Sequence, residues 1–161
     1  MKKKSLNPVI IILIVLLFGV KLFVIFSCCM RFVQPGGAAD IGTLKWEYQK
    51  AVNDGDVDRY LALVPRSERN SLEKSCVSDK LKNLSGHNYQ MELEDEEKKD
   101  SDRTGEIIGE LLVLDPIGSP IVSKVYDAHI KVKDESGESN IITLEVLEIN
   151  DRYFIHDVEM D

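Results

Sequence analysis

The stretch that decides the fold is ITLEVLEINDRYFIHD, residues 142–157, close to the C-terminus. Apolar and polar residues alternate on both sides of Asn150 and Asp151, which is the period of two of a half-buried β-strand. Asparagine and aspartate tolerate positive φ, so this pair predicts a two-residue hairpin turn. We therefore predict two antiparallel strands, over residues 141–149 and 152–159.

Two further strands are predicted upstream of this hairpin. Residues 122–132 alternate in the same way, and residues 135–138 form a turn that leads into the hairpin. Alternation also begins at Tyr89, and we place the end of that strand and a loop in the acidic stretch 94–102. The second half of the chain therefore predicts a meander of antiparallel strands.

Helical periodicity dominates the region before the strands. One apolar stripe is followed by Gly55, a natural left-handed helix end, and Asp56 is placed to cap a second helix that Pro65 stops. The stripe consists of Leu44, Tyr48, Ala51 and Val52. Residues 67–74 are polar and predict a short surface helix.

Residues 105–114 interrupt the strands with a helical pattern. Their apolar residues come in pairs four apart, which fits a helix and breaks the period of a strand. Asp102 or Thr104 is expected to cap this helix. Helices followed by antiparallel strands define an α+β fold, and we expect the helices to pack on one face of the sheet. The predicted core is Leu44, Tyr48, Val52, Tyr60, Leu61, Leu111, Ala128, Ile130, Leu144, Val146 and Tyr153.

Two of these motifs resemble nuclear transport factor 2-like domains. YQKAVNDGD (residues 48–56) followed by YLALV (60–64) is similar to the break between the first two helices of that family, and the closing hairpin is similar to its last two strands. Tyr153 stands where the family usually has tryptophan. The resemblance covers residues 43–158 and implies a curved antiparallel sheet wrapped around helices, often with a pocket at the open end of the cone. It is nearest to the versions found in bacterial envelope proteins behind one membrane helix or a lipid anchor.

The N-terminus carries the features of a signal anchor. Three lysines, residues 2–4, precede an apolar run over residues 9–30, and this run of 22 residues contains one charge, Lys21. Crossing a bilayer takes roughly 20 helical residues, and the apolar residues offset the cost of the lysine. The positive-inside rule keeps the N-terminus in the cytoplasm. We predict a cytoplasmic tail (1–8), a transmembrane helix (9–30), a linker (31–42) and an extracytoplasmic α+β domain (43–161) of a single-pass protein of the cell membrane.

Two alternatives to an uncleaved anchor stay open. Residues 37–39 are small enough for a signal-peptide cleavage site, although they lie far beyond the apolar run. Residues 25–28 loosely resemble a bacterial lipobox, which would make Cys28 a lipidation site. Phe26 is a poor fit to that motif, where small residues are usual.

The charge distribution argues against two classes of partner. All 28 acidic residues lie at or after Asp40, and this part of the chain holds 15 basic residues, a net charge of −13. Such a domain repels nucleic acid and anionic lipid headgroups, so neither is expected as a partner of the soluble part.

The metal-binding patterns in the chain are incomplete. Asp54, Asp56 and Asp58 have the spacing of a calcium loop, but Arg59 and Pro65 occupy the positions that need glycine and glutamate. The three histidines, His87, His129 and His156, have no partner at ligand spacing. We predict no metal and no cofactor.

A catalytic constellation is not evident either. Tyr60, Tyr126, Asp127 and His129 are the residues that a cone-shaped active site could use, but Tyr126 and Asp127 are consecutive on a strand and face opposite sides. Cys76, the one cysteine outside the apolar run and its flank, is expected to be a buried small hydrophobe.

The expected function is a non-catalytic module that binds a small ligand or another envelope protein, with the ligand-binding residues unknown. An isomerase- or dehydratase-like enzyme and a lipoprotein with a structural role are the alternatives. An apolar pocket that holds one buried acid and a facing tyrosine would favour the enzyme. Tyr153 is expected to lie over the first helix near Trp46 or Tyr48, so Tyr153→Ala should destabilise the domain more than Phe154→Ala.

Overall fold

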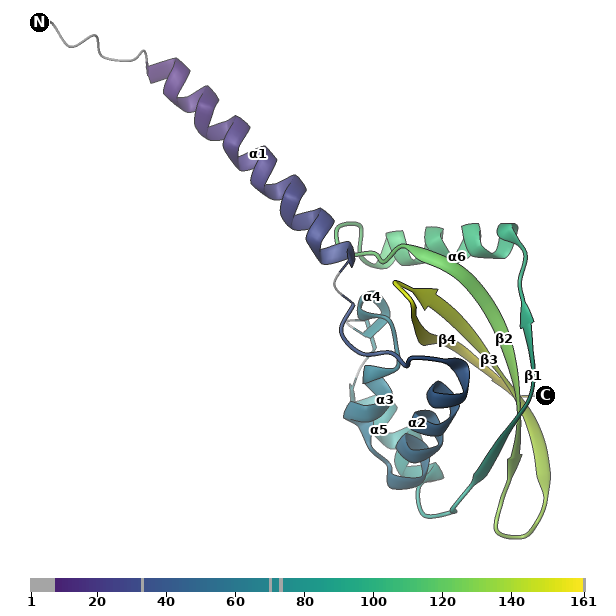
Figure 1. Cartoon of the computed structure of the whole chain (residues 1–161). Coiled ribbons are helices and arrows are strands. Elements are labelled where there is room, and N and C mark those ends of the chain that lie inside the picture. Colours follow the sequence, from purple (N-terminus) through teal and green to yellow (C-terminus); the bar gives the residue numbers. More distant parts are fainter. Residues whose placement is uncertain (1–7, 33, 70, 73, 161) are drawn as a thin grey trace, which may run out of the picture.

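The computed structural model describes residues 8–32, 34–69, 71–72 and 74–160, and within these the side chains of residues 8–11, 27, 28, 30–32, 74 and 75 are not described. Six helices and four strands follow one another along these residues (Figure 1). They are α1 (Pro8–Phe32), α2 (Ile41–Asp54), α3 (Val57–Ala62), α4 (Arg66–Arg69), α5 (Lys74–Leu84), β1 (Gln90–Lys98), α6 (Ser101–Leu114), β2 (Val122–Lys133), β3 (Ser139–Ile149) and β4 (Arg152–Met160).

The four strands form one antiparallel sheet in the order β1-β2-β3-β4. Asn150 and Asp151 have φ of 53° and 58°, so the predicted hairpin turn is confirmed. β4 bulges at His156, because Glu145 pairs with Asp157 while the next residue of β3, Val146, pairs with Ile155. The α+β class predicted from the order of elements is confirmed.

The sheet is covered on both faces, so the expectation of helices on one face is wrong. Leu144 and Val146 of β3 pack in one apolar cluster, whereas Leu147 and Ile149 of the same strand pack in another. Successive strand residues point to opposite faces, so the two clusters lie on opposite sides of the sheet. Figure 1 shows α2, α3 and α5 along one side of the curved sheet and α6 across another part of it.

The α2 cluster is the larger of the two and holds most of the predicted core. Its buried members are Ala38, Ile41, Leu44, Tyr48, Val52, Leu61, Leu63, Val77, Leu81, Met91, Ala128, Ile130, Ile142, Leu144, Val146 and Ile155. The α6 cluster consists of Ile107, Leu111, Val122, Val125, Leu147, Ile149 and Phe154. Of the predicted core residues, only Tyr60 and Tyr153 are half-buried rather than buried.

Tyr153 and Phe154 take the opposite roles from those predicted. Tyr153 is half-buried, its ring centroid lies 6.0 Å from that of Tyr126, and its backbone pairs with Ala38. Phe154 is fully buried in the α6 cluster. Trp46 is 47% exposed, so it is no anchor for an aromatic contact between the two ends of the domain.

The helix caps follow the sequence in one case and differ in another. Asp56 caps α3 by accepting a hydrogen bond from the backbone N–H of Arg59, as predicted. The helix predicted over residues 105–114 is confirmed as α6. It begins earlier than expected, because Asp100 caps it rather than Asp102 or Thr104.

Two other expectations are corrected by the structure. β1 continues to Lys98 through the acidic stretch that we expected to be a loop, because its pairing with β2 extends that far. Cys76 on α5 is exposed, not buried. A polar, highly charged strand is stable here because β1 lies at the edge of the sheet, where side chains reach water.

Helix α1 points away from the rest of the molecule in Figure 1, and its large side chains between residues 12 and 26 are more than half exposed. Over the residues whose structure is described, none of the helices has the combined length and apolar character of a membrane span. Part of the predicted linker belongs to the folded domain: Gln34 and Ala38 are buried, and Arg152 donates a hydrogen bond to the carbonyl of Gly37.

Candidate functional site

A pocket of about 310 Å³ opens between the helices of the α2 cluster and the C-terminal half of β4. Most of its wall is apolar, and its charged residues are Glu68, Lys80, His156 and Asp157. It is lined by Tyr48, Tyr60, Val64, Glu68, Leu72, Val77, Lys80, Leu81, Leu84, His156, Asp157, Val158 and Met160. Such a wall can hold an apolar group and still orient it by a few hydrogen bonds.

Glu68 and His156 form the polar centre of this pocket. Glu68 lies on the single turn of α4, and His156 sits at the bulge of β4, where the strand leaves regular pairing. The Nδ1 atom of His156 is 2.8 Å from a carboxylate oxygen of Glu68, and both side chains are 11% exposed. A carboxylate this far from water needs such a partner.

The pKa of each partner is raised, for different reasons. Burial raises the pKa of Glu68, and the hydrogen bond and charge of His156 oppose that shift only in part. Burial lowers the pKa of His156, but the hydrogen bond that His156 donates to Glu68 and the charges of Glu68, Glu145 and Glu110 outweigh it. The folded chain therefore holds protons at this site more tightly than an exposed glutamate and histidine would.

Three more charged residues connect the Glu68–His156 pair to α6. The Nε2 atom of His156 lies 3.4 Å from a carboxylate oxygen of Glu110 and 3.7 Å from one of Glu145. Arg103 binds both oxygens of Glu145, at 2.7 Å and 2.8 Å, in the bidentate geometry of a strong ion pair. Residues from α4, α6, β3 and β4 therefore meet in one charged network around the imidazole.

The two tyrosines of the pocket are held as neutral hydroxyls. The rings of Tyr48 and Tyr60 lie 6.2 Å apart between centroids. Burial raises the pKa of both, and for Tyr60 the nearby charges of Asp157 and Glu68 raise it further. Neutral phenols next to a carboxylate can donate hydrogen bonds to a ligand as well as accept them.

A smaller cavity of about 150 Å³ shares Tyr48, Leu84 and Met160 with the main pocket. Its other lining residues are Val52, Tyr89, Met91, Val132, Asn140 and Ile142, so it is almost wholly apolar. The two cavities are therefore neighbours that meet at these three shared side chains.

The structure does not bring the predicted catalytic set together. Of its four members only Tyr60 lines the pocket. The Tyr126 hydroxyl donates to Glu148, Asp127 pairs with Lys99, and His129 contacts the Thr143 hydroxyl at 3.0 Å. Asp127 and Tyr126 point to opposite faces, as their adjacency predicted.

The metal and lipidation predictions concern different parts of the chain. Within the part of the chain that the structure describes, no group of three or more histidine, cysteine, aspartate or glutamate side chains has the geometry to hold a metal ion. Asp54 pairs with Arg59, at 3.6 Å, instead of forming a calcium loop with Asp56. The side chain of Cys28, the predicted lipidation site, lies outside the described residues.

A second, strongly charged groove of about 590 Å³ lies on the other face of the sheet, beside the N-terminal end of α6. Acidic residues from all four strands line it together with lysines and Arg103. Two of its ion pairs form within the domain, because Lys99 binds Asp127 and Arg103 binds Glu145. The groove therefore offers mainly charged groups, whereas the pocket offers a mostly apolar wall.

No sequence pattern indicates that Glu68 and His156 belong to a site. Glu68 lies in a polar stretch with no periodicity, and His156 has the appearance of an ordinary strand histidine. Only the bulge in β4 and the chain path through α4 bring the two together. Comparisons with protein families, with curated proteins and with solved structures give no match to this chain.

Proposed function

We propose that the protein is a membrane-anchored extracytoplasmic binding module whose pocket between α3, α5 and β4 takes a small ligand. The observation that carries this proposal is the lining of the pocket, in which apolar walls surround the buried Glu68–His156 pair and Tyr60. The pocket reaches the lower end of the volume range of small-molecule sites, and the cavity beyond Met160 extends it.

The chemistry of the lining selects a class of ligand. Leu81, Leu84 and Val158 provide apolar contact, and Tyr60 and Glu68 provide hydrogen-bonding groups at one end. A molecule with an aromatic or aliphatic body and one hydrogen-bonding head, such as an amine or an alcohol, matches this division. The charged residues of the lining are of both signs, Glu68 and Asp157 against Lys80 and His156, so charge alone does not select between an amine and a carboxylic acid.

The position of the pocket agrees with a nuclear transport factor 2-like cone. A curved antiparallel sheet with helices against its inner side and a pocket between them is what the resemblance implied. This support concerns shape alone, because fold does not determine chemistry.

An enzyme of the isomerase or dehydratase kind is the second candidate, and one observation favours it. The pocket holds a buried acid, Glu68, near the facing tyrosine Tyr60, which is the arrangement that we expected of an enzyme. Binding remains the first proposal because Glu68 is engaged by His156, and His156 is surrounded by Glu110 and Glu145 in a network that extends to α6. A lipoprotein with a structural envelope role stays the third candidate.

Methionine methyl NMR tests the binding proposal with internal controls. The chain has four methionines; Met160 and Met91 line the cavities, whereas Met1 and Met30 belong to the N-terminal region. We expect benzylamine and indole, used as cationic and neutral probes of the apolar wall, to shift the Met160 and Met91 signals saturably and to leave the other two unchanged.

Matched tryptophan variants complete this test. Met160→Trp places a large ring in the mouth of the pocket, and Val113→Trp places the same ring on exposed α6, away from it. The first variant should abolish the shift of Met91 and the second should preserve it. Equal, non-saturable shifts at all four methionines would contradict a binding pocket.

Membrane attachment is tested separately on cells that express the full chain. An anchored chain stays in the membrane pellet after alkaline carbonate extraction and keeps its N-terminal residues in intact-mass analysis. A mature chain that begins near Asp40, or a mass that includes a lipid on Cys28, would replace the anchor with one of the alternatives.

A further inference from the structure

The end of α6 and the turn that leads to β2 carry several exposed apolar side chains. They are Leu112, Val113, Leu114, Ile117 and Ile121, here named the α6 turn patch, whose side chains are 39%, 82%, 49%, 44% and 51% exposed. The inner side of the same helix is sealed, since Ile107 and Leu111 are fully buried against the sheet. An exposed run of this size marks a surface that meets an apolar partner.

The place of this patch identifies the partner. Gln34, two residues after the end of α1, is buried and its amide nitrogen lies 3.5 Å from the carbonyl oxygen of Gly118, in the middle of the patch loop. Consecutive Cα atoms are about 3.8 Å apart, so the end of α1 at Phe32 lies within about 8 Å of Gln34 whatever direction the chain takes. Figure 1 shows the α6–β2 turn beside the end of α1.

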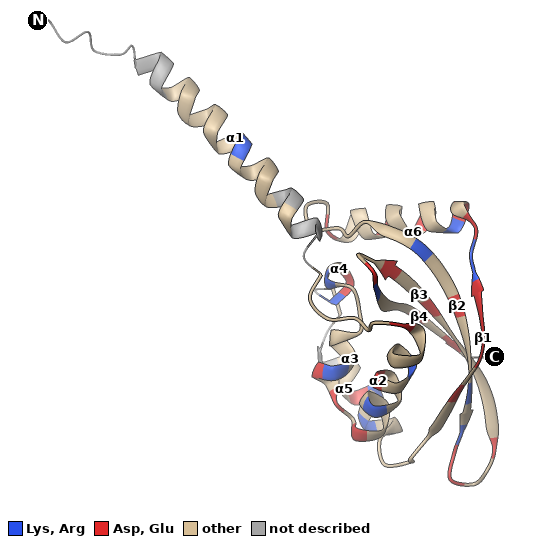
Figure 2. Ribbon diagram, viewed as in Figure 1, with Lys and Arg blue, Asp and Glu red and all other residues tan. Residues whose placement is uncertain are grey.

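Three arginines lie at the same end of the domain, alongside the acidic Glu68, Asp115 and Asp151. The guanidinium group of Arg69 donates to the carbonyl of Pro35, that of Arg152 donates to the carbonyl of Gly37, and the backbone N–H of Arg66 donates to Gln34. Burial and the neighbouring charge of Arg66 lower the pKa of Arg69, which places these two cations close together. Figure 2 shows the basic colour on α4 next to the end of α1.

The structure points to a lipid bilayer as the occupant of this surface. We propose that the α6 turn patch enters the interfacial layer of the membrane in which α1 is anchored, with Arg66, Arg69 and Arg152 toward the phosphate groups of the lipids. Apolar side chains flanked by cations are the combination that binds at the boundary of headgroups and acyl chains. The inference rests on the proposed membrane anchor, and it adds that the domain lies against the membrane in one orientation.

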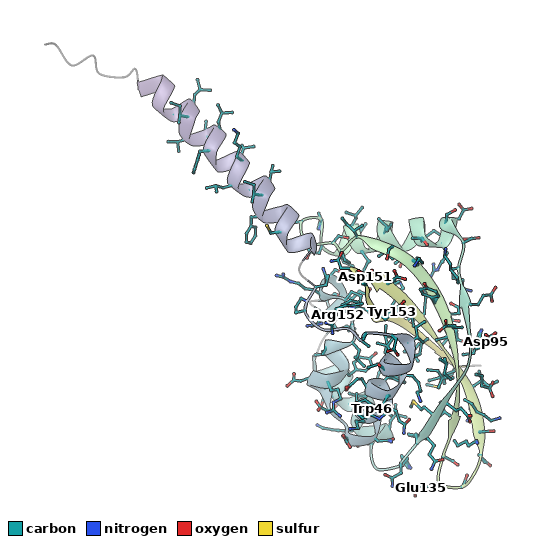
Figure 3. All side chains as sticks on the ribbon, in the orientation of Figure 1. Trp46, Asp95, Glu135, Asp151, Arg152 and Tyr153 are labelled. Atoms are coloured by element: carbon teal, nitrogen blue, oxygen red, sulfur yellow. The ribbon has the colours of Figure 1, made fainter. Side chains whose placement is uncertain are left out.

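The natural sequence is well suited to a test by fluorescence, because its single tryptophan, Trp46, is partly exposed on α2 and can be moved. In a Trp46→Phe background, Val113→Trp places the reporter in the patch. Glu135→Trp places it at the opposite end of the domain, where Figure 3 labels Glu135 far from the end of α1. Both positions are exposed, so the variants differ in location and not in burial.

The full-length variants are reconstituted into vesicles of equal parts phosphatidylcholine and phosphatidylglycerol, with bromine on the upper part of the acyl chains. Interfacial side chains reach about 5–10 Å into the headgroup and acyl boundary, so we expect quenching at position 113 to exceed that at position 135 by about twofold or more. Adding Ile117→Asp to the patch reporter should remove most of this excess.

Flotation of the same vesicles separates the possible failures. If the chain floats and the two reporters are quenched equally, the patch does not touch the membrane and the inference is wrong, while the anchor stands. If the unsubstituted chain does not float, the anchor is wrong and the inference falls with it. Strong quenching at 113 that Ile117→Asp leaves unchanged would also overturn it, because the contact would then not depend on the apolar patch.

Discussion

The two faces of the sheet are covered in different ways. The α6 cluster has seven buried residues, and one amphipathic helix closes it against Phe154. The α2 cluster is more than twice as large, yet it borders the pocket, and several of its neighbours, among them Tyr60, are only partly buried. In this domain the larger apolar cluster is therefore the less completely buried one. We expect the small cluster to contribute more stability for each residue, and the large one to carry the binding site.

Phe154→Ala tests the first half of this comparison and should have the largest effect. Removing a fully buried phenylalanine leaves a cavity that costs about 3–5 kcal/mol, a large share of the stability of a domain this size. Denaturant unfolding of the full chain in detergent micelles measures the loss. Tyr153→Ala is the matched control and should cost clearly less, because Tyr153 is half-buried. Equal losses would show that the two clusters do not differ in closure.

The same pair of residues shows where sequence reasoning reaches its limit. Alternation in residues 142–157 correctly predicts both strands and the turn, and it places Tyr153 and Phe154 on opposite faces. It does not tell which face is better covered, because that depends on where α6 packs. The helical pattern of α6 was readable from its paired apolar residues, whereas its position over the second face comes from tertiary packing.

The candidate site was less predictable than the fold. Tyr60 was singled out as a residue that a cone could use, and it lines the pocket. Glu68 and His156 come from elements whose sequences contain no signal for a site, a four-residue helix and a strand bulge. Contacts between residues 88 positions apart depend on the whole chain path, and neither composition nor periodicity encodes them.

The ionic network around His156 predicts that the free energy of unfolding falls as the pH rises. The pKa of His156 is raised in the folded chain, so its contribution is complete below about pH 6.5 and is lost as the pH rises through the folded value. The pKa of Glu68 is raised too, so its ionisation in the folded chain costs free energy from about pH 4.5 upward. Both effects have the same sign, and the free energy of unfolding should decrease between about pH 5 and pH 8.

His156→Gln should flatten this pH dependence and lower the free energy of unfolding by about 1.5–3 kcal/mol at pH 6, the usual range for a hydrogen bond to a charged group. His87→Gln is the control, because His87 is exposed and its substitution should change neither value. Unfolding curves over the pH range measure both. A His156→Gln chain with the pH slope of the natural chain would show that the network does not couple to folding.

The tight packing of the α6 cluster around Phe154 is expected to depend on Gly37. A Cβ on Gly37 would lie 2.6 Å from the Cζ atom of Phe154, and Gly37 has φ of +68°. Gly37→Ala should therefore cost about 1–3 kcal/mol through overpacking and strain. Gly86→Ala isolates the strain, since Gly86 has φ of +87° and open space around its Cβ position. If thermal melts show the same loss of melting temperature for both variants, the predicted clash with Phe154 is wrong.

The smallest expected effect concerns the ion pair that joins α6 to the sheet. Glu145 is 9% exposed and both of its oxygens are bound by Arg103, so a lysine at position 103 keeps the charge and loses the bidentate geometry. Arg103 is more than a third exposed, and water screens the pair, so we expect Arg103→Lys to cost about 1 kcal/mol or less. A double-mutant cycle with Glu145→Gln measures the coupling directly. Because Glu145 also faces His156, the coupling should grow above the raised pKa of His156, when the neutral imidazole no longer competes with Arg103 for the charge of Glu145. A coupling that is the same at about pH 5 and pH 8 would place the Arg103–Glu145 pair outside the network and leave α6 held by its apolar face alone.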